Sequence, residues 1–98
     1  MKTRISITQK DIDEGVEGNC SLCPVAISTR RVVADDCAVK VSGRSIILEP
    51  RNRVDTLGIS LPPRVRRFIL FVDLRKRSAL KPMSFTREIP ERFLKVAA

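Results

Sequence analysis

The chain has 98 residues, of which 43% are hydrophobic and 31% are charged, a balance typical of one globular domain with a modest core and not of a disordered or fibrous chain. No apolar run approaches the roughly 20 residues that a membrane-spanning helix needs, and the first residues lack the apolar segment of a secretory signal. The net charge is +8, and histidine is absent, which excludes the usual Ser-His-Asp and Cys-His catalytic sets.

The first third of the chain predicts a short strand and two helices. Residues 4–7, R-I-S-I, alternate polar and apolar side chains as a strand does. The sequence T-Q-K-D at 8–11 is a capping box with Asp in place of Glu, so a short helix is expected over 9–14 and should end at Gly15. A second helix is expected from Ser21 or Leu22 to Val33, with Pro24 in its first turn, where a missing N–H costs nothing.

The middle of the chain predicts antiparallel strands. Residues 37–50 hold two β-rich runs on either side of S-G-R at 42–44, which is typical of a hairpin. A third apolar run covers 53–61, and Gly58 within it suggests a β-bulge.

A longer helix is predicted to begin at Pro62 or Pro63. Its apolar residues have the 3, 1, 3 spacing of a helix packed on a core; they are Val65, Phe68, Ile69 and Val72. Leu70 and Leu74 fall on the opposite face, with Phe71 to one side. Because such a helix must be covered twice, we expect either a second copy of the chain or the C-terminal tail, with Phe93 and Leu94, to bury Leu70.

Met83 and Phe85 fall on one side of a predicted closing strand, and a short tail helix is expected over 91–96. Taken together, the pattern predicts a single α+β domain over residues 1–98, in which a small antiparallel sheet of about four or five strands carries two main helices.

The C-x-x-C sequence formed by Cys20 and Cys23 has three interpretations. Tetrahedral zinc needs four ligands, and the chain adds only the distant Cys37, so these three cysteines are a weak metal site. A redox pair near a helix N-terminus is chemically reasonable, although no βαβ pattern precedes it. The interpretation that we favour is a pair of small buried side chains at the start of the second helix.

An odd number of cysteines also argues against a secreted disulfide framework, so we expect reduced thiols and a cytoplasmic location.

Other catalytic patterns are weak. The carboxylate pairs at 11 and 13 and at 35 and 36 suit a helix N-terminus and a turn, and the four glycines form no phosphate-binding loop. We therefore expect no enzyme activity and no cofactor, and any phosphate site must be built from arginines and helix N-termini.

The basic residues are concentrated in the second part of the chain. Residues 1–36 have five basic and six acidic side chains, whereas the rest carry 14 and five. The densest group comprises Arg64, Arg66, Arg67, Arg75, Lys76 and Arg77, while Arg30 and Arg31 end the second helix. Such asymmetry favours an anionic partner, although a solvated basic face is the simpler interpretation. Sequence-specific nucleic-acid recognition is not indicated, because the chain has no Trp or Tyr for base stacking.

Three stretches carry a resemblance to a known family: ITQKDIDEGVEGNCSLCPVAIS at 7–28, LPPRVRRFILFVD at 61–73 and LKPMSF at 80–85. They are similar to small uncharacterised proteins of tailed bacteriophages and prophages, whose pattern is I-T-Q-x-D-I-x-x-G, then C-x-x-C-P-[VI]-A, a helix ending in F-x-D and a closing P-x-x-F. The match spans roughly residues 5–85 and departs at LRKRSAL. The resemblance implies a phage setting, in which small accessory proteins often antagonise host defences.

These observations lead to an expected function. The chain is expected to be a non-enzymatic, homo-oligomeric host-defence antagonist that captures a nucleotide-type immune signal at a subunit interface. Arg30, Arg31, Arg64, Arg66 and Arg67 would clamp its phosphate, and the helix N-termini at Ser21 and Pro63 would add N–H donors. The alternatives are a phage protein that binds nucleic acid through general electrostatics and an inhibitor that binds a host defence protein directly.

Overall fold

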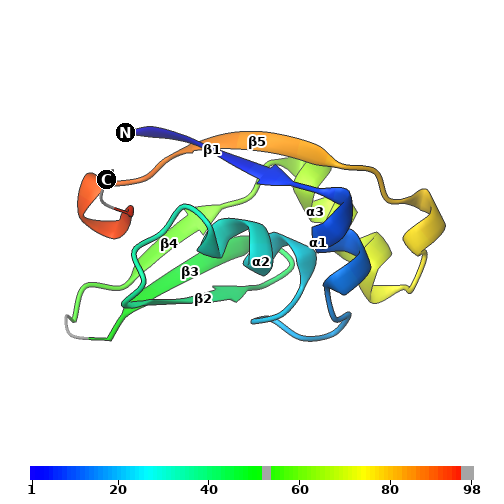
Figure 1. Cartoon of the computed structure of the whole chain (residues 1–98), viewed down its shortest axis with the longest axis horizontal. Helices are drawn as coiled ribbons and strands as arrows, with labels where there is room; N and C mark the ends of the chain where they lie inside the picture. The colour runs from blue at the N-terminus through cyan, green and yellow to red at the C-terminus, as the bar shows by residue number, and fades with distance from the viewer. Residues whose placement is uncertain (52–53, 96–98) are drawn as a thin grey trace.

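The computed structural model describes residues 1–51 and 54–95 (Figure 1). The elements follow one another as β1 (Lys2–Ile7), α1 (Gln9–Glu14), α2 (Pro24–Arg30), β2 (Cys37–Val41), β3 (Ser45–Pro50), β4 (Leu57–Ser60), α3 (Pro63–Asp73) and β5 (Met83–Glu88). Two 3₁₀ turns, Arg77–Ala79 and Glu91–Phe93, flank β5. Within these residues, no helix is long and apolar enough to span a membrane.

The strands form two antiparallel sheets. The first and last strands pair along their whole length, with Ile5 opposite Phe85, and β2, β3 and β4 make a three-stranded meander. The predicted α+β class and the 37–50 hairpin are therefore confirmed. The division of the strands between two sheets was not predicted, because periodicity indicates strands without indicating which strands pair.

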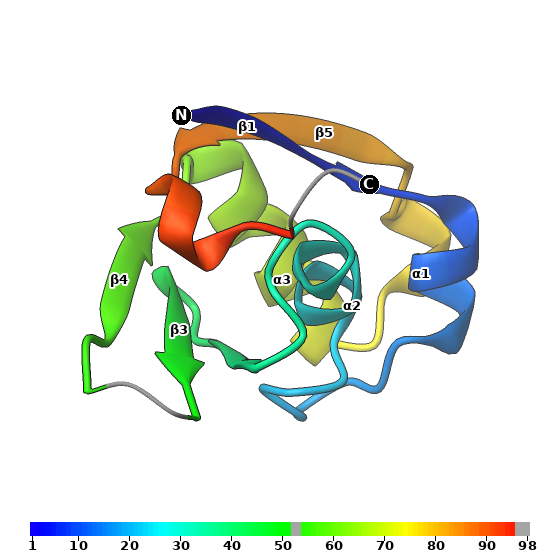
Figure 2. The ribbon, with the colours of Figure 1, turned by 60° about the vertical axis from the view of Figure 1, so that its left-hand side comes forward.

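Helices α2 and α3 lie beneath the β1–β5 ribbon, with the three-stranded sheet beside them (Figures 1 and 2). The largest fully buried side chains come from both sheets and from the tail, and include Ile5, Ile46, Leu48, Phe85 and Phe93. The predicted core stripe of α3 is confirmed, because Val65, Phe68, Ile69 and Val72 are all buried. One continuous core thus joins the two sheets through the two helices.

The short helix α1 begins and ends where the sequence predicts. Thr8 Oγ1 accepts a hydrogen bond from Asp11 N, and Thr8 N donates to Asp11 Oδ2 at 2.8 Å, which completes the capping box. Gly15 ends the helix, but not because it takes a left-handed conformation, since its φ is −65°. A Cβ at this position would lie 2.5 Å from Pro24 Cδ and Cγ. Glycine is needed here because the chain passes against the first residue of α2.

Three details differ from the sequence predictions. Helix α2 begins at Pro24 rather than at Ser21 or Leu22, because Asn19 accepts hydrogen bonds from Ser21 N and Leu22 N and holds these residues in a turn. The helix ends at Arg30 rather than at Val33. Gly58 pairs in regular register with Ile47, so the predicted bulge is absent. The tail helix is reduced to a 3₁₀ turn.

Some of the predicted features cannot be followed in the structure. Arg53 and Val96, which bounded the third β-rich run and the tail helix, lie outside the described residues. The side chain of Arg77, a member of the basic group, lies outside them as well.

The tail packs away from the outer face of α3. Ala34 N donates to Phe93 O at 2.9 Å, and Val33 forms a bridge with Leu94, so the tail covers the connection between α2 and β2. Leu70 and Leu74 remain 53% and 54% exposed. The prediction that the tail buries Leu70 is therefore wrong, and the prediction of a second copy stays open.

Candidate functional site

Three of the five predicted anion-binding arginines are engaged by the protein itself. Arg31 donates from Nη1 and Nη2 to the two carboxylate oxygens of Asp11, at 2.6 and 2.5 Å, and from Nη2 to Ser6 O at 2.7 Å. Arg30 donates to Ser21 O, and Arg66 Nε donates to Leu61 O at 3.0 Å. These bonds hold loops and helix ends in place, so Arg30 and Arg31 stabilise the folded chain.

The other two arginines meet in a pocket of about 250 Å³ on the side of α3. We call it the basic pocket, and its lining comprises Arg64, Arg67, Phe68, Phe71, Ala79, Leu80, Lys81, Pro82 and Met83. No acidic side chain is among the lining residues. The pocket therefore combines cationic groups with an apolar wall.

The helical repeat explains one wall of the basic pocket. Arg64, Arg67, Phe68 and Phe71 have the spacing i, i+3, i+4, i+7 and so share one side of α3. The opposite wall comes from the connection between α3 and β5, which places Lys81 and Met83 against that side. The two walls lie opposite each other because the chain folds back after α3, so that β5 can pair with β1.

The cations of the basic pocket have no counterion in the part of the chain that the structure describes. Within residues 1–51 and 54–95, the side chains of Arg64, Arg67 and Lys81 make no hydrogen bond or ion pair. Three neighbouring positive charges repel one another and gain from an anion placed between them. Guanidinium groups also bind phosphate and carboxylate oxygens in a bidentate manner, so the arrangement suits an anion that carries an apolar part.

The helix N-termini contribute less than predicted. Helix α2 does not begin at Ser21, whose backbone N–H donates to Asn19 Oδ1 at 2.9 Å. Helix α3 begins after Pro62 with Pro63, and neither proline has an N–H to offer a ligand. Neither of the predicted N–H donors, at Ser21 and at Pro63, is therefore available to a ligand.

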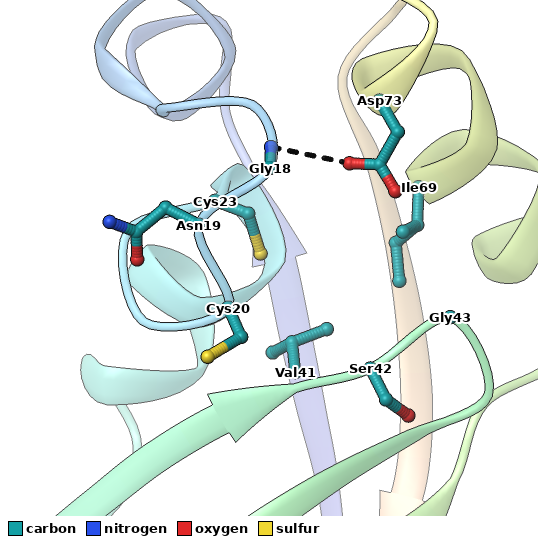
Figure 3. Close-up of a pocket in the computed structure, with 9 residues that line it drawn as sticks. All are labelled: Gly18, Asn19, Cys20, Cys23, Val41, Ser42, Gly43, Ile69 and Asp73. Carbon is teal, nitrogen blue, oxygen red and sulfur yellow. Dashed lines mark hydrogen bonds between the residues drawn. The ribbon is translucent and has the colours of Figure 1, made fainter.

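A second, smaller pocket of about 130 Å³ contains the C-x-x-C cysteines (Figure 3). We call it the thiol pocket; its lining comprises Gly18, Asn19, Cys20, Cys23, Val41, Ser42, Gly43, Ile69 and Asp73. Gly18 N donates to Asp73 Oδ1 at 3.4 Å across its mouth. Cys20 is exposed and Cys23 is buried, and burial raises the pKa of the Cys23 thiol.

The weak metal site predicted from Cys20, Cys23 and Cys37 is not assembled in the described part of the chain. Cys37 begins β2 and is not among the residues of the thiol pocket. Across the described residues, no group of three or more Cys, Asp or Glu side chains is arranged to hold a metal ion. The interpretation of the pair as buried packing residues fits Cys23 but not the exposed Cys20.

Sequence reasoning missed three contributors to the basic pocket, namely Phe71, Lys81 and Met83. The sequence pattern places Phe71 only beside the outer face of α3, and Lys81 lies outside the densest basic group. Their shared location depends on how the α3–β5 connection folds back, and no local pattern encodes it. The i, i+3, i+4, i+7 spacing of Arg64, Arg67, Phe68 and Phe71 is a signal that could have found half of the pocket.

No protein-family model, curated protein or solved structure matches the chain. The function is therefore inferred from the geometry of the chain itself.

Proposed function

We propose that the chain is a non-enzymatic binding protein whose basic pocket captures a nucleotide-type anion. The observation that carries the proposal is a set of three cations, Arg64, Arg67 and Lys81, that have no counterion among the described residues and lie beside the apolar wall of Phe68, Phe71 and Met83. Phosphate oxygens match the guanidinium groups, and a base stacks on an aromatic side chain or packs on the apolar wall.

The size of the pocket limits the ligand. A volume of about 250 Å³ is slightly below the roughly 300–1,000 Å³ of ordinary ligand pockets. It suits one base or one sugar-phosphate unit and not a long polymer. A larger or cyclic nucleotide requires additional walls.

A second copy of the chain is proposed to supply those walls. Leu70 and Leu74 are exposed on α3, next to the side that carries Arg67 and Phe71. Paired across this face, two chains place their basic pockets at or near the interface. The proposed biological role is the removal of a nucleotide immune signal from the cytoplasm of a phage-infected bacterium, a setting that rests on the sequence resemblance.

The test is a binding experiment with two matched double variants. Arg64→Gln/Arg67→Gln removes the cations of the pocket, whereas Lys40→Gln/Arg51→Gln removes the same charge from exposed positions on β2 and after β3. Thermal shift and calorimetry against a panel of mononucleotides and cyclic nucleotides should show saturable binding by the wild type. Because each charge-assisted hydrogen bond contributes about 1.5–3 kcal/mol, the first variant should bind at least about tenfold more weakly, and the control should bind like the wild type.

The same experiment distinguishes the alternatives. If no nucleotide binds, but a DNA oligomer binds with an affinity that falls steeply with salt and does not depend on sequence, general electrostatic binding of nucleic acid replaces the proposal. If both variants lose nucleotide binding equally, net charge rather than the pocket is responsible. Absence of binding to every nucleotide and to DNA would leave capture of a host protein as the surviving function.

A further inference from the structure

The thiol pocket brings together two cysteines of different accessibility. Both Cys20 and Cys23 line it, and Figure 3 shows the Cys23 side chain directed toward Val41. Cys20 is exposed, so a dissolved reagent can reach its sulfur, whereas Cys23 is buried. This division allows exchange in two steps, because the exposed thiol can react with the reagent and a second thiol nearby can then attack the mixed disulfide.

The backbone places the two cysteines in one hydrogen-bonded turn. Asn19 O accepts hydrogen bonds from Leu22 N at 3.3 Å and from Cys23 N at 3.0 Å, so the chain from Asn19 to Cys23 is one tight turn. Cys20 and Cys23 are the second and fifth residues of this turn, and a disulfide between them requires their Cα atoms to lie within about 7 Å of each other. Asn19 Oδ1 fixes the turn further by accepting from Ser21 N and Leu22 N.

The surroundings also separate this pair from the third cysteine. Cys37 is buried at the start of β2, and its Sγ lies 3.9 Å from Asp36 Oδ1. It is not a lining residue of the thiol pocket. Exchange chemistry should therefore be confined to Cys20 and Cys23.

We propose that Cys20 and Cys23 form a thiol–disulfide exchange site for small disulfides such as glutathione disulfide. The thiolate of Cys20 attacks one sulfur of the reagent, forming a Cys20–glutathione mixed disulfide and releasing one glutathione thiolate, which takes up a proton. The Cys23 thiol then loses its proton, and its sulfur attacks Cys20 Sγ and expels the second glutathione. Overall, the two protein thiols are oxidised to one disulfide and the reagent is reduced to two thiols.

The experiment follows the intact mass of the reduced protein after incubation with glutathione disulfide. The wild type should lose two hydrogens, and alkylation followed by peptide mapping should then label Cys37 alone after unfolding. Cys23→Ser should stop at the mixed disulfide and retain one glutathione on Cys20. Cys20→Ser should show neither product, and Cys37→Ser should behave like the wild type.

Three results would overturn the proposal: a wild type that stays fully reduced, one that accumulates the glutathione adduct without closing the disulfide, and one that reacts mainly at Cys37. Because Cys23 is buried, its variant is first compared with the wild type by circular dichroism. If Cys23→Ser does not fold, the peptide map of the folded wild type still decides, since it assigns the disulfide without any variant.

Discussion

Arg31 and Asp11 hold together the N-terminal strand and the first two helices. The Asp11 carboxylate is almost fully buried, while the Arg31 side chain is 46% exposed. The Asp11 carboxylate also accepts a hydrogen bond from Thr8 N in the capping box of α1, and Arg31 donates to the carbonyl of Ser6 near the end of β1. A buried carboxylate is tolerated only when it is paired and hydrogen-bonded. This arginine therefore stabilises the fold, although its place in a basic sequence had suggested a ligand-binding role.

The pair predicts a specific loss of stability in acid. Burial alone would raise the pKa of Asp11, but hydrogen bonds from Arg31 and Thr8 and the charge of Arg31 outweigh it and lower the pKa below its ordinary value of 3.8. A lowered pKa means that the stabilisation is complete above the ordinary value and is lost as the pH falls through 3.8 and below. Urea unfolding of the wild type from about pH 7 to about pH 2 should show this decline.

The matched variant is Arg31→Gln, which leaves the buried carboxylate without its counterion. We expect it to lower the free energy of unfolding at neutral pH by about 2 kcal/mol, a moderate value because Arg31 is partly exposed. The acid-dependent part of the stability curve should shrink. Arg64→Gln changes an exposed arginine that has no partner among the described residues, and it should change stability by less than about 0.5 kcal/mol. Equal effects of the two substitutions would contradict this account.

Among the elements, the junction between α1 and α2 depends on close packing of backbone against a ring. Gly15 ends α1 and passes against Pro24, the first residue of α2. The ring of Pro24 is rigid and buried, so it cannot move aside as the end of a flexible side chain could. The contact fixes where α2 begins relative to α1, and thereby where the connection over residues 16–23, which carries Cys20 and Cys23, ends.

Gly15→Ala is predicted to disturb this junction. A Cβ 2.5 Å from two ring carbons of Pro24 forces a backbone shift, which should cost about 1–3 kcal/mol of unfolding free energy. Gly43→Ala is the control, because a Cβ there has nothing within 4 Å and its φ is not in the left-handed region. Denaturant curves should leave the control close to the wild type. A wild-type midpoint for Gly15→Ala would show that the junction is looser than the structure indicates.

The elements also show what the sequence could and could not predict. The capping box of α1, the hairpin of β2 and β3 and the buried stripe of α3 were predictable because local patterns encode them. The pairing of β1 with β5 joins residues such as Ile5 and Phe85 across most of the chain, and no local pattern specifies it. The basic pocket depends on that pairing, so sequence reasoning identified Arg64 and Arg67 but not the wall that faces them. For the same reason it could not tell that Arg31 faces Asp11.

For the whole molecule, the basic pocket and the exposed apolar residues Leu70 and Leu74 all lie on or beside α3. The buried side of this helix belongs to the core, whereas the outer side shows Leu70 and Leu74 to solvent. The basic pocket lies on the flank between these two sides. A second chain docked on the leucines would therefore border the pocket and would shield its charges from water, which strengthens their attraction for an anion.

The oligomer predicted from this arrangement can be tested by a substitution that introduces one charge into the proposed interface. Leu70→Glu places a carboxylate in the proposed contact and should convert a dimer to a monomer in sedimentation equilibrium, since burying an unpaired charge is strongly unfavourable. The side chain of Leu70 is 53% exposed in the single chain, so thermal unfolding of the variant should remain cooperative. Val54→Glu introduces the same charge at another exposed apolar residue and should leave the oligomer intact. A wild type that sediments as a monomer at all concentrations would refute the proposed interface, and nucleotide binding would then have to be complete within one chain.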